Sequence, residues 1–145
     1  MQVVGAILVN NGEILCARRG IGKYEYVSKK FEFPGGKIEP GETPQQALHR
    51  ELIEEMLVDI DIADMSYFDT VNHKYPDFEM TMETFICPIA NRDVTLTEHL
   101  EIMWLPVGEI DTLDWAQADW PIVRSLINRG TEKHYEHKRQ FGIKP

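Results

Sequence analysis

Three glutamates in the middle of the chain have a spacing that suits a metal-binding helix face. Glu51, Glu54 and Glu55 stand at positions i, i+3 and i+4, so on an α-helix they share one side. Three carboxylates there repel one another and destabilise the helix unless a cation neutralises them. Clustered oxygen ligands suit a hard divalent ion, and Mg²⁺ is commonly held by a few carboxylates together with substrate phosphates. The spacing therefore predicts a site for Mg²⁺ or Mn²⁺.

The same three glutamates have a plainer interpretation as a solvated helix face. Arg50 lies four residues before Glu54, so the two side chains can form an exposed ion pair on the helix. Read from the glutamates alone, this alternative is the simpler one. The residues that precede the helix decide between the two.

The helix that would carry the glutamates has a clear start in the sequence. Thr43 is a good N-cap residue, Pro44 fits the first helical position, and Gln46 completes a capping box. Apolar residues then recur at helical spacing and predict a buried stripe. These residues are Ala47, Leu48, Leu52 and Met56. We therefore expect a helix over residues 43–56.

A double glycine before this helix completes a longer pattern. Pro34-Gly35-Gly36 lets the backbone turn sharply and approach a ligand closely. Gly36, five residues, Glu42, seven residues, Arg50-Glu51-Leu52, one residue and Glu54-Glu55 together resemble the Nudix box. The stretch FEFPGGKIEPGETPQQA, residues 31–47, is similar to the MutT-like branch of the Nudix hydrolases, the nucleoside triphosphate pyrophosphohydrolases. The chain departs from the box at Leu57, where the family has glycine. If the helix ends there in a left-handed residue, a side chain costs roughly 1 kcal/mol.

The resemblance implies roles for the box residues. Glu51, Glu54 and Glu55 would hold the divalent metal together with the backbone carbonyl of Gly36. Arg50 and Glu42 would keep the carboxylates in place, and Lys37 would lie near the phosphates.

A further metal ligand or catalytic base is expected just before a tryptophan-bearing strand. MutT-like enzymes often have a glutamate about six residues before that tryptophan, and Glu98 stands in this relation to Trp104. Its neighbours His99 and Glu101 are alternatives for the role. A solvated loop acid is the plain alternative for Glu98.

The resemblance also implies substrate-binding residues outside the box. Arg19 ends a predicted strand where MutT-like proteins place a phosphate-contacting arginine; strand alternation allows only one of Arg18 and Arg19 to face the site. Phe33 would line the base pocket, and Phe78 is a second candidate. Exposed strand-end arginines and core aromatic residues are the alternatives.

Asp119 is the candidate reader of the nucleobase. It falls where MutT has an asparagine that contacts an oxidised guanine. An ionised aspartate only accepts hydrogen bonds, so it favours an amino or protonated ring edge, as on guanine or cytosine. The alternative is that Asp119 only caps the helix that begins near Pro121.

Size and charge exclude several classes of protein. A chain of 145 residues with 43% apolar residues is typical of one globular domain, which we place at residues 1–130, with a tail or helix extension at 131–145. A net charge of −9 argues against a nucleic-acid polymer as partner.

Cys16 and Cys87 are predicted to be buried free thiols in a reducing cytoplasm. The N-terminal apolar stretch is too short for a membrane span and lacks a signal peptide's basic leader.

The order of predicted elements indicates an α/β fold. Strands are expected at 3–10 and 13–19, joined by an Asn11-Gly12 hairpin turn, at 31–33, over the extended stretch 59–73, and at 79–89 and within 98–105. A second helix is expected at 121–128. Two helices on opposite faces of a mixed sheet give a three-layer α/β/α sandwich, which is also the fold that the Nudix resemblance implies.

Three functions compete at this point. The first is divalent-metal-dependent hydrolysis of a nucleoside triphosphate to a monophosphate and pyrophosphate, with oxidised or modified triphosphates of the guanine or cytosine type among the candidate substrates. The second is hydrolysis of another nucleoside-diphosphate derivative, such as a nucleotide sugar. The third is a non-catalytic, nucleotide-sensing module. The intact row of repelling glutamates argues against the third. The protein is expected to act as a monomer or homodimer in the cytoplasm.

Overall fold

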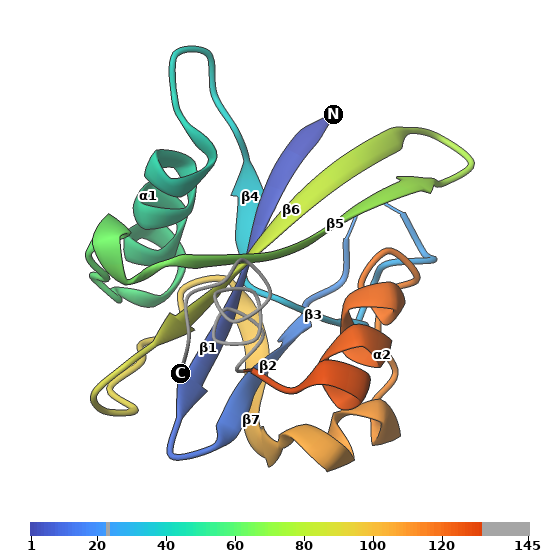
Figure 1. Cartoon of the computed structure of the whole chain (residues 1–145). Helices are drawn as coiled ribbons and strands as arrows, with labels where there is room; N and C mark the ends of the chain where they lie inside the picture. The colour runs from blue at the N-terminus through green and yellow to red at the C-terminus, as the bar shows by residue number, and fades with distance from the viewer. Residues whose placement is uncertain (23, 132–145) are drawn as a thin grey trace, which may run out of the picture.

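The computed structural model describes residues 1–22 and 24–131, which form one mixed sheet with a helix on each face (Figure 1). No helix in this part of the chain is long and apolar enough to cross a membrane. The elements, with η for 3-10 helix, are β1 (Gln2–Asn10), β2 (Glu13–Arg19), β3 (Phe31–Glu32), β4 (Gly35–Lys37), α1 (Pro44–Met56), η1 (Ile62–Asp64), β5 (Ser66–Lys74), β6 (Glu79–Pro88), β7 (His99–Pro106), η2 (Val107–Thr112) and α2 (Trp120–Arg129).

The described strands form a sheet whose central path runs β3-β2-β1-β6-β5, with β4 added to β1 and β7 added to β2. The β1–β6 pair is parallel over eight residues, and the other pairs are antiparallel. The predicted hairpin between β1 and β2 is confirmed, since Asn11 and Gly12 both have positive φ, 51° and 77°. Because one strand pair is parallel and the others are antiparallel, the predicted mixed sheet is also confirmed.

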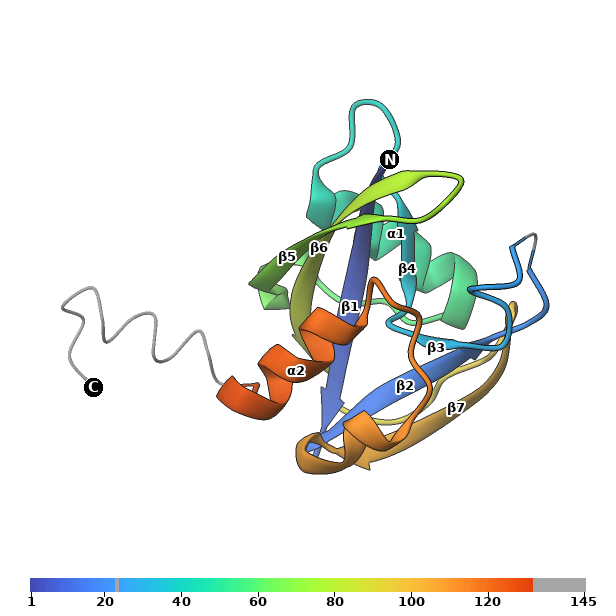
Figure 2. The ribbon, with the colours of Figure 1, turned by 90° about the vertical axis from the view of Figure 1, so that its right-hand side faces the viewer.

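The two helices cover opposite faces of this sheet, as Figure 2 shows. On one face α1 buries its predicted stripe in a cluster that includes Leu8, Leu15 and Phe85. On the other face α2 packs Ile122, Val123 and Leu126 into a second cluster around Trp115 and Phe68. The α/β/α sandwich that the sequence predicts is thus the observed fold.

The N-terminal end of α1 is capped as its sequence indicates, and its C-terminal end falls at Leu57, where the chain departs from the box. The Thr43 side chain accepts a hydrogen bond from the Gln46 amide, and the Gln46 side chain accepts one from the Thr43 amide, so the capping box is formed. At the other end Leu57 adopts the left-handed conformation with φ 53° and ψ 37°. The helix therefore ends as it would with glycine, and it bears a side-chain strain of roughly 1 kcal/mol.

β1 and β2 diverge from their shared turn, and this opens the sheet. They pair only at Val9–Ile14 and Asn10–Glu13. Beyond that point β1 pairs with β4, and β2 pairs with β3 and β7. Away from their shared turn, β1 and β2 therefore leave room between them, on the side where the double glycine and the end of β2 lie.

The structure corrects the prediction for residues 59–69. We expected an extended segment there, but residues 62–64 form the 3-10 helix η1, and β5 begins only at Ser66. The Asp61 side chain accepts a hydrogen bond from the Ala63 amide and so starts this turn. Such a local side-chain contact competes with the extended conformation that the apolar pattern favoured. Of the predicted tail at 131–145, all residues except Thr131 lie outside the described residues.

Candidate active site

A pocket of about 640 Å³ lies where β1 and β2 diverge. One end of it is acidic and the other end is aromatic, and it takes residues from β1, the end of β2, β4, α1 and the loop before α2. Most of the site residues predicted from the sequence line this pocket, namely Arg19, Phe33, Gly36, Lys37, Glu51, Glu55, Phe78, Glu98 and Asp119. The topology thus brings together side chains that are up to 100 positions apart, from Arg19 to Asp119.

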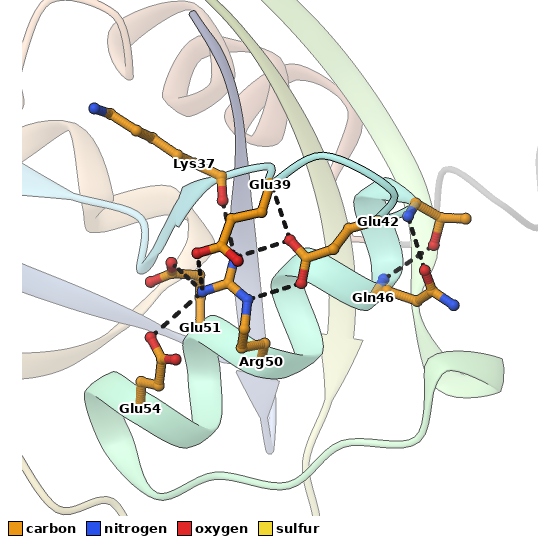
Figure 3. Close-up of polar contacts among 8 residues, drawn as sticks. Lys37, Glu39, Glu42, Gln46, Arg50, Glu51 and Glu54 are labelled. Atoms are coloured by element: carbon orange, nitrogen blue, oxygen red, sulfur yellow. Dashed lines mark hydrogen bonds and ion pairs between the residues drawn. The ribbon is translucent and has the colours of Figure 1, made fainter.

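Arg50 is the centre of a hydrogen-bond network beside the acidic end (Figure 3). Its Nε and Nη2 donate to the two carboxylate oxygens of Glu42 at 2.8 and 2.9 Å, and its Nη1 donates to Glu51 Oε1 at 2.8 Å. Its Nη2 also donates to the Lys37 carbonyl at 3.0 Å. These bonds lower the pKa of Glu42 to about 2. Arg50 therefore ties the loop before α1 to the helix and orients the Glu51 carboxylate.

Gly36 leaves the space that the Glu51 carboxylate occupies. A Cβ atom at residue 36 would stand 2.6 and 2.7 Å from the two oxygens of Glu51, closer than real side chains approach. The backbone of β4 and the Glu51 carboxylate can therefore lie side by side only because residue 36 is glycine.

Glu55 is the buried member of the acidic end. It is 4% exposed, although it carries an ionisable group. Burial is the main reason why the pKa of Glu55 is raised to about 9, and neighbouring carboxyls raise it further. Those neighbours are Glu32, Glu51 and Glu98. A bound cation would stabilise the ionised form of a carboxyl in this setting.

The segment before β7 is attached to the last turn of α1. Thr97 Oγ1 donates to the carbonyl oxygens of Glu54 and Glu55, at 3.0 and 2.8 Å, and the Thr97 amide donates to the Glu55 carbonyl at 3.1 Å. These bonds place Glu98 at the pocket, next to the buried carboxyl. The expected role of Glu98 stays a prediction, but its position agrees with it.

Strand alternation separates the two arginines at the end of β2, as predicted. Arg18 pairs with Glu101 on the other face at 2.7 Å, whereas Arg19 lines the pocket. The Arg19 guanidinium donates to Glu32 Oε1 at 3.2 Å. Glu32 Oε2 in turn lies 3.0 Å from Nε2 of His99.

The other end of the pocket is aromatic. The Phe33 ring stacks on Trp115 with ring centroids 4.6 Å apart. Phe78 contacts Tyr24 and Tyr75 at 5.5 and 5.1 Å between centroids. Flat apolar walls of this kind suit a planar ligand such as a nucleobase.

Asp119 lines the aromatic end of the pocket. It is 5% exposed, and its Oδ2 accepts a hydrogen bond from the Phe33 amide at 3.2 Å. Although it directly precedes α2, its side chain makes no capping hydrogen bond, so capping does not explain it. Burial raises the pKa of Asp119 well above its ordinary value, and the charge of Glu32 acts in the same direction. The acceptor-only role expected of Asp119 applies to its ionised form, whereas the protonated form, which burial favours, can both donate and accept a hydrogen bond.

Three predicted residues stand outside the pocket lining. Arg50 and Glu42 lie behind it, as their predicted supporting role requires. Glu54 is 59% exposed and its Oε2 lies 3.4 Å from Arg50 Nη1. The i+4 pair that the plainer interpretation expected is therefore present, together with the closer contacts of Arg50 to Glu42 and Glu51.

The ligand chemistry of the acidic end suits a divalent ion, but its side chains do not converge on one coordination point. Its donors are carboxylate oxygens beside a glycine backbone, which is the ligand type that Mg²⁺ and Mn²⁺ prefer. Within residues 1–22 and 24–131, no three His, Cys, Asp or Glu side chains converge closely enough to hold a metal as they stand. The buried Glu55 and its carboxyl neighbours Glu51 and Glu98 place negative charge here that a bound cation would offset.

Sequence reasoning missed Glu32 and gave His99 only as a substitute for its neighbour. Glu32 stands between two core phenylalanines, so its face was not assigned, although alternation along β3 turns it away from them toward the acidic end. Tyr75, whose hydroxyl accepts a hydrogen bond from the Ala118 amide at 3.0 Å, also lines the pocket and was not among the predicted residues. None of these positions has a sequence signal apart from alternation.

Comparison with known proteins supports this arrangement. A family model described as the NUDIX domain matches residues 1–126. The 8-oxo-dGTP diphosphatase of Escherichia coli is 33% identical over 123 residues, which cover 85% of this chain and 92% of that protein. The CTP pyrophosphohydrolase of Escherichia coli is 28% identical over 127 residues, 88% of this chain and 91% of that protein.

A solved structure shares both the sequence pattern and the fold. It is the solution structure of the MutT protein, family Nudix hydrolase, from methicillin-resistant Staphylococcus aureus. It is 38% identical to this chain, covers 90% of this chain and 97% of its own, and superposes with a TM-score of 0.64. With the family model matching most of the chain, this protein belongs to the NUDIX family and is a MutT-like Nudix hydrolase.

Proposed function

We propose that this protein hydrolyses a nucleoside triphosphate to a nucleoside monophosphate and pyrophosphate, with Mg²⁺ or Mn²⁺ as the cofactor. The observation that carries the proposal is one pocket with carboxylates at one end and aromatic rings at the other. A nucleotide has the same polarity, since its phosphates need a cation and its base is planar and apolar-faced. The pocket volume of about 640 Å³ is in the range of small-ligand sites.

In this proposal the residues at the acidic end hold the metal and the phosphates. Glu51, Glu55 and Glu98, with the Gly36 carbonyl, are the proposed ligands within the pocket, Glu54 is a proposed ligand from the exposed helix face beside it, and Glu98 is also a candidate base. A divalent ion bound there would neutralise phosphate charge and lower the pKa of a bound water. Arg19 and Lys37 would contact phosphate oxygens, and Figure 3 shows the Lys37 side chain directed away from the Arg50 network.

The Arg50–Glu42 pair would keep the carboxylates in place during turnover. The two hydrogen bonds between them and the bond to Glu51 fix the helix face against the loop. Positioning of this kind accounts for much of the catalysis in phosphoryl and pyrophosphoryl transfer, where the protein performs little covalent chemistry.

The base would lie at the aromatic end, with Phe33 and Phe78 as walls and Asp119 at the edge. Because burial raises the pKa of Asp119, the protonated form of its carboxyl is favoured more than in a free aspartate, and in that form it could donate one hydrogen bond and accept another. A guanine, oxidised guanine or cytosine edge offers such a donor–acceptor pair. The relatives include an 8-oxo-dGTP diphosphatase and a CTP pyrophosphohydrolase, which supports both base types.

A free nucleotide suits this chain better than a nucleic-acid polymer, because the net charge is −9 and a polymer would need a basic surface.

We further propose that the Nudix domain comprises residues 1–130 and that the protein acts in the cytoplasm as a monomer or homodimer. Both cysteines are buried free thiols, as a reducing compartment would leave them.

The substrate class is tested by a panel of triphosphates, deoxytriphosphates, oxidised nucleotides and nucleotide sugars with Mg²⁺ or Mn²⁺. We expect pyrophosphate and a monophosphate as products from at least one triphosphate, and no turnover in excess chelator. Full activity in chelator would contradict the metal requirement. Turnover of nucleotide sugars alone would favour a different Nudix substrate.

The metal-site assignment predicts that Glu51→Gln, Glu54→Gln and Glu55→Gln each lower kcat by about 100-fold or more, because a bound metal contributes several kcal/mol to charge stabilisation. Glu55→Gln should not lower the melting temperature, since it removes a buried group whose raised pKa reports a poor site for charge. The exposed Glu109→Gln is the matched control. Unchanged kcat in all three variants would rule out the assignment.

The proposed base contact predicts that Asp119→Ala changes the ranking of bases by about tenfold or more, the worth of a hydrogen bond in a buried site. Asp119→Asn should keep more of the ranking, because a neutral amide also donates and accepts. The measurement is kcat/KM for each triphosphate. An equal fall for every base would show that Asp119 does not read the base.

A further inference from the structure

His99 is a buried histidine whose two ring nitrogens both face carboxylates. Its side chain is 3% exposed. Nε2 lies 3.0 Å from Glu32 Oε2, and Nδ1 lies 3.7 Å from Glu55 Oε2. Nδ1 is fully buried and has no hydrogen-bond partner among the described residues. The imidazole thus stands between a glutamate of β3 and the buried glutamate of α1.

A β-bulge brings His99 to this position. Arg18 is opposite Glu101 in the β2–β7 pair, but Arg19 is opposite His99, so β7 has one extra residue at Leu100. Ile102 and Trp104 pack on the α1 face, and regular alternation would therefore turn Leu100 to that face and His99 to the other. The extra residue reverses this order and directs His99 toward Glu55.

The contacts of His99 continue on both sides. An ionised carboxylate only accepts hydrogen bonds, so in the contact between Nε2 and an ionised Glu32 the donor is the ring nitrogen. Glu32 also accepts a hydrogen bond from Arg19 at 3.2 Å. A continuous row of side chains, from Arg19 through Glu32 and His99 to Glu55, therefore crosses the acidic end of the pocket from β2 to α1.

A merely space-filling role does not explain this arrangement. Leaving a buried polar nitrogen without a partner costs about 1–3 kcal/mol, which an apolar side chain at the bulge would avoid. The cost is incurred at the atom that faces Glu55. Carboxylates that ligate metals are commonly oriented by polar side chains behind them, and His99 occupies such a place beside Glu55.

We propose that His99 is a positioning residue that sets the orientation of the Glu55 carboxylate for the divalent ion, braced by Glu32. The inference rests on the proposed function, because it requires that Glu55 serve the metal. His99 would touch neither substrate nor reacting atoms. Its loss should therefore weaken metal binding and lower kcat while leaving the KM for the nucleotide nearly unchanged.

The test compares three variants of the full chain with the wild type. His99→Leu removes both polar contacts, and His99→Gln keeps a donor near the Nε2 position for Glu32. His49→Leu is the matched control, since His49 also contacts a carboxylate, Asp59 at 2.9 Å, but lies outside the pocket. The readouts are Mn²⁺ affinity by calorimetry without nucleotide, kcat and KM separately, and the melting temperature.

We expect His99→Leu to bind Mn²⁺ about 10–100-fold more weakly, the usual effect of losing a residue that orients a metal ligand, and to lose kcat to a similar degree. KM should change less than about threefold, and His99→Gln should lie between His99→Leu and the wild type. His49→Leu should match the wild type. If His99→Leu does not fold, a weaker Mn²⁺ affinity in folded His99→Gln carries the test.

Wild-type Mn²⁺ affinity in the folded His99 variants, with only a lower melting temperature, would overturn the proposal and leave the proposed function standing. A wild-type protein that neither binds Mn²⁺ nor hydrolyses any triphosphate would instead overturn the proposed function, and this inference with it. The two failures are therefore distinguishable.

Discussion

The crowding of negative charge around the buried Glu55 is the constraint on which the rest of this structure depends. A carboxyl with 4% exposure and three acidic neighbours has its pKa raised to about 9, so its charged form is disfavoured in the absence of a cation. A helix gains nothing in stability from such a group. The fold tolerates it because α1 is held by its capping box, by its buried stripe and by the Arg50 network.

The divergence of β1 and β2 separates the charged part of the pocket from its aromatic part. Because β1 and β2 separate after their turn, the glycine backbone of β4 and the end of β2 can face α1 from one side, while the loop before α2 approaches from the other. Charged groups gather on the α1 side. Aromatic groups and Asp119 gather toward α2. The polarity of the pocket thus follows from the three-layer arrangement, with one helix on each face.

Local signals in the sequence predicted the elements that carry the site. The capping box at Thr43, the Asn11-Gly12 hairpin and the buried stripe of α1 each depend on neighbouring residues, and all three are observed. Three pocket residues, Gly36, Glu51 and Glu55, belong to the motif with fixed spacing by which the family was first identified. The fold then brings them together, because β4 lies beside α1.

Features that depend on tertiary context were not predictable in the same way. The bulge at Leu100 inserts one residue without any sequence signal, so the direction of His99 could not be assigned. The raised pKa of Asp119 comes from burial, which the local sequence does not report. The 3-10 helix at 62–64 begins where the Asp61 side chain starts a turn, inside a stretch that alternates acidic and apolar residues.

The central claim is that these carboxylates exist to bind a divalent ion, and anomalous diffraction from crystals soaked in Mn²⁺ tests it most directly. The account predicts a peak about 2.0–2.4 Å from the carboxylate oxygens of Glu51 and Glu55, beside the Gly36 backbone. A peak elsewhere, or none at this end of the pocket at a saturating concentration, would contradict it.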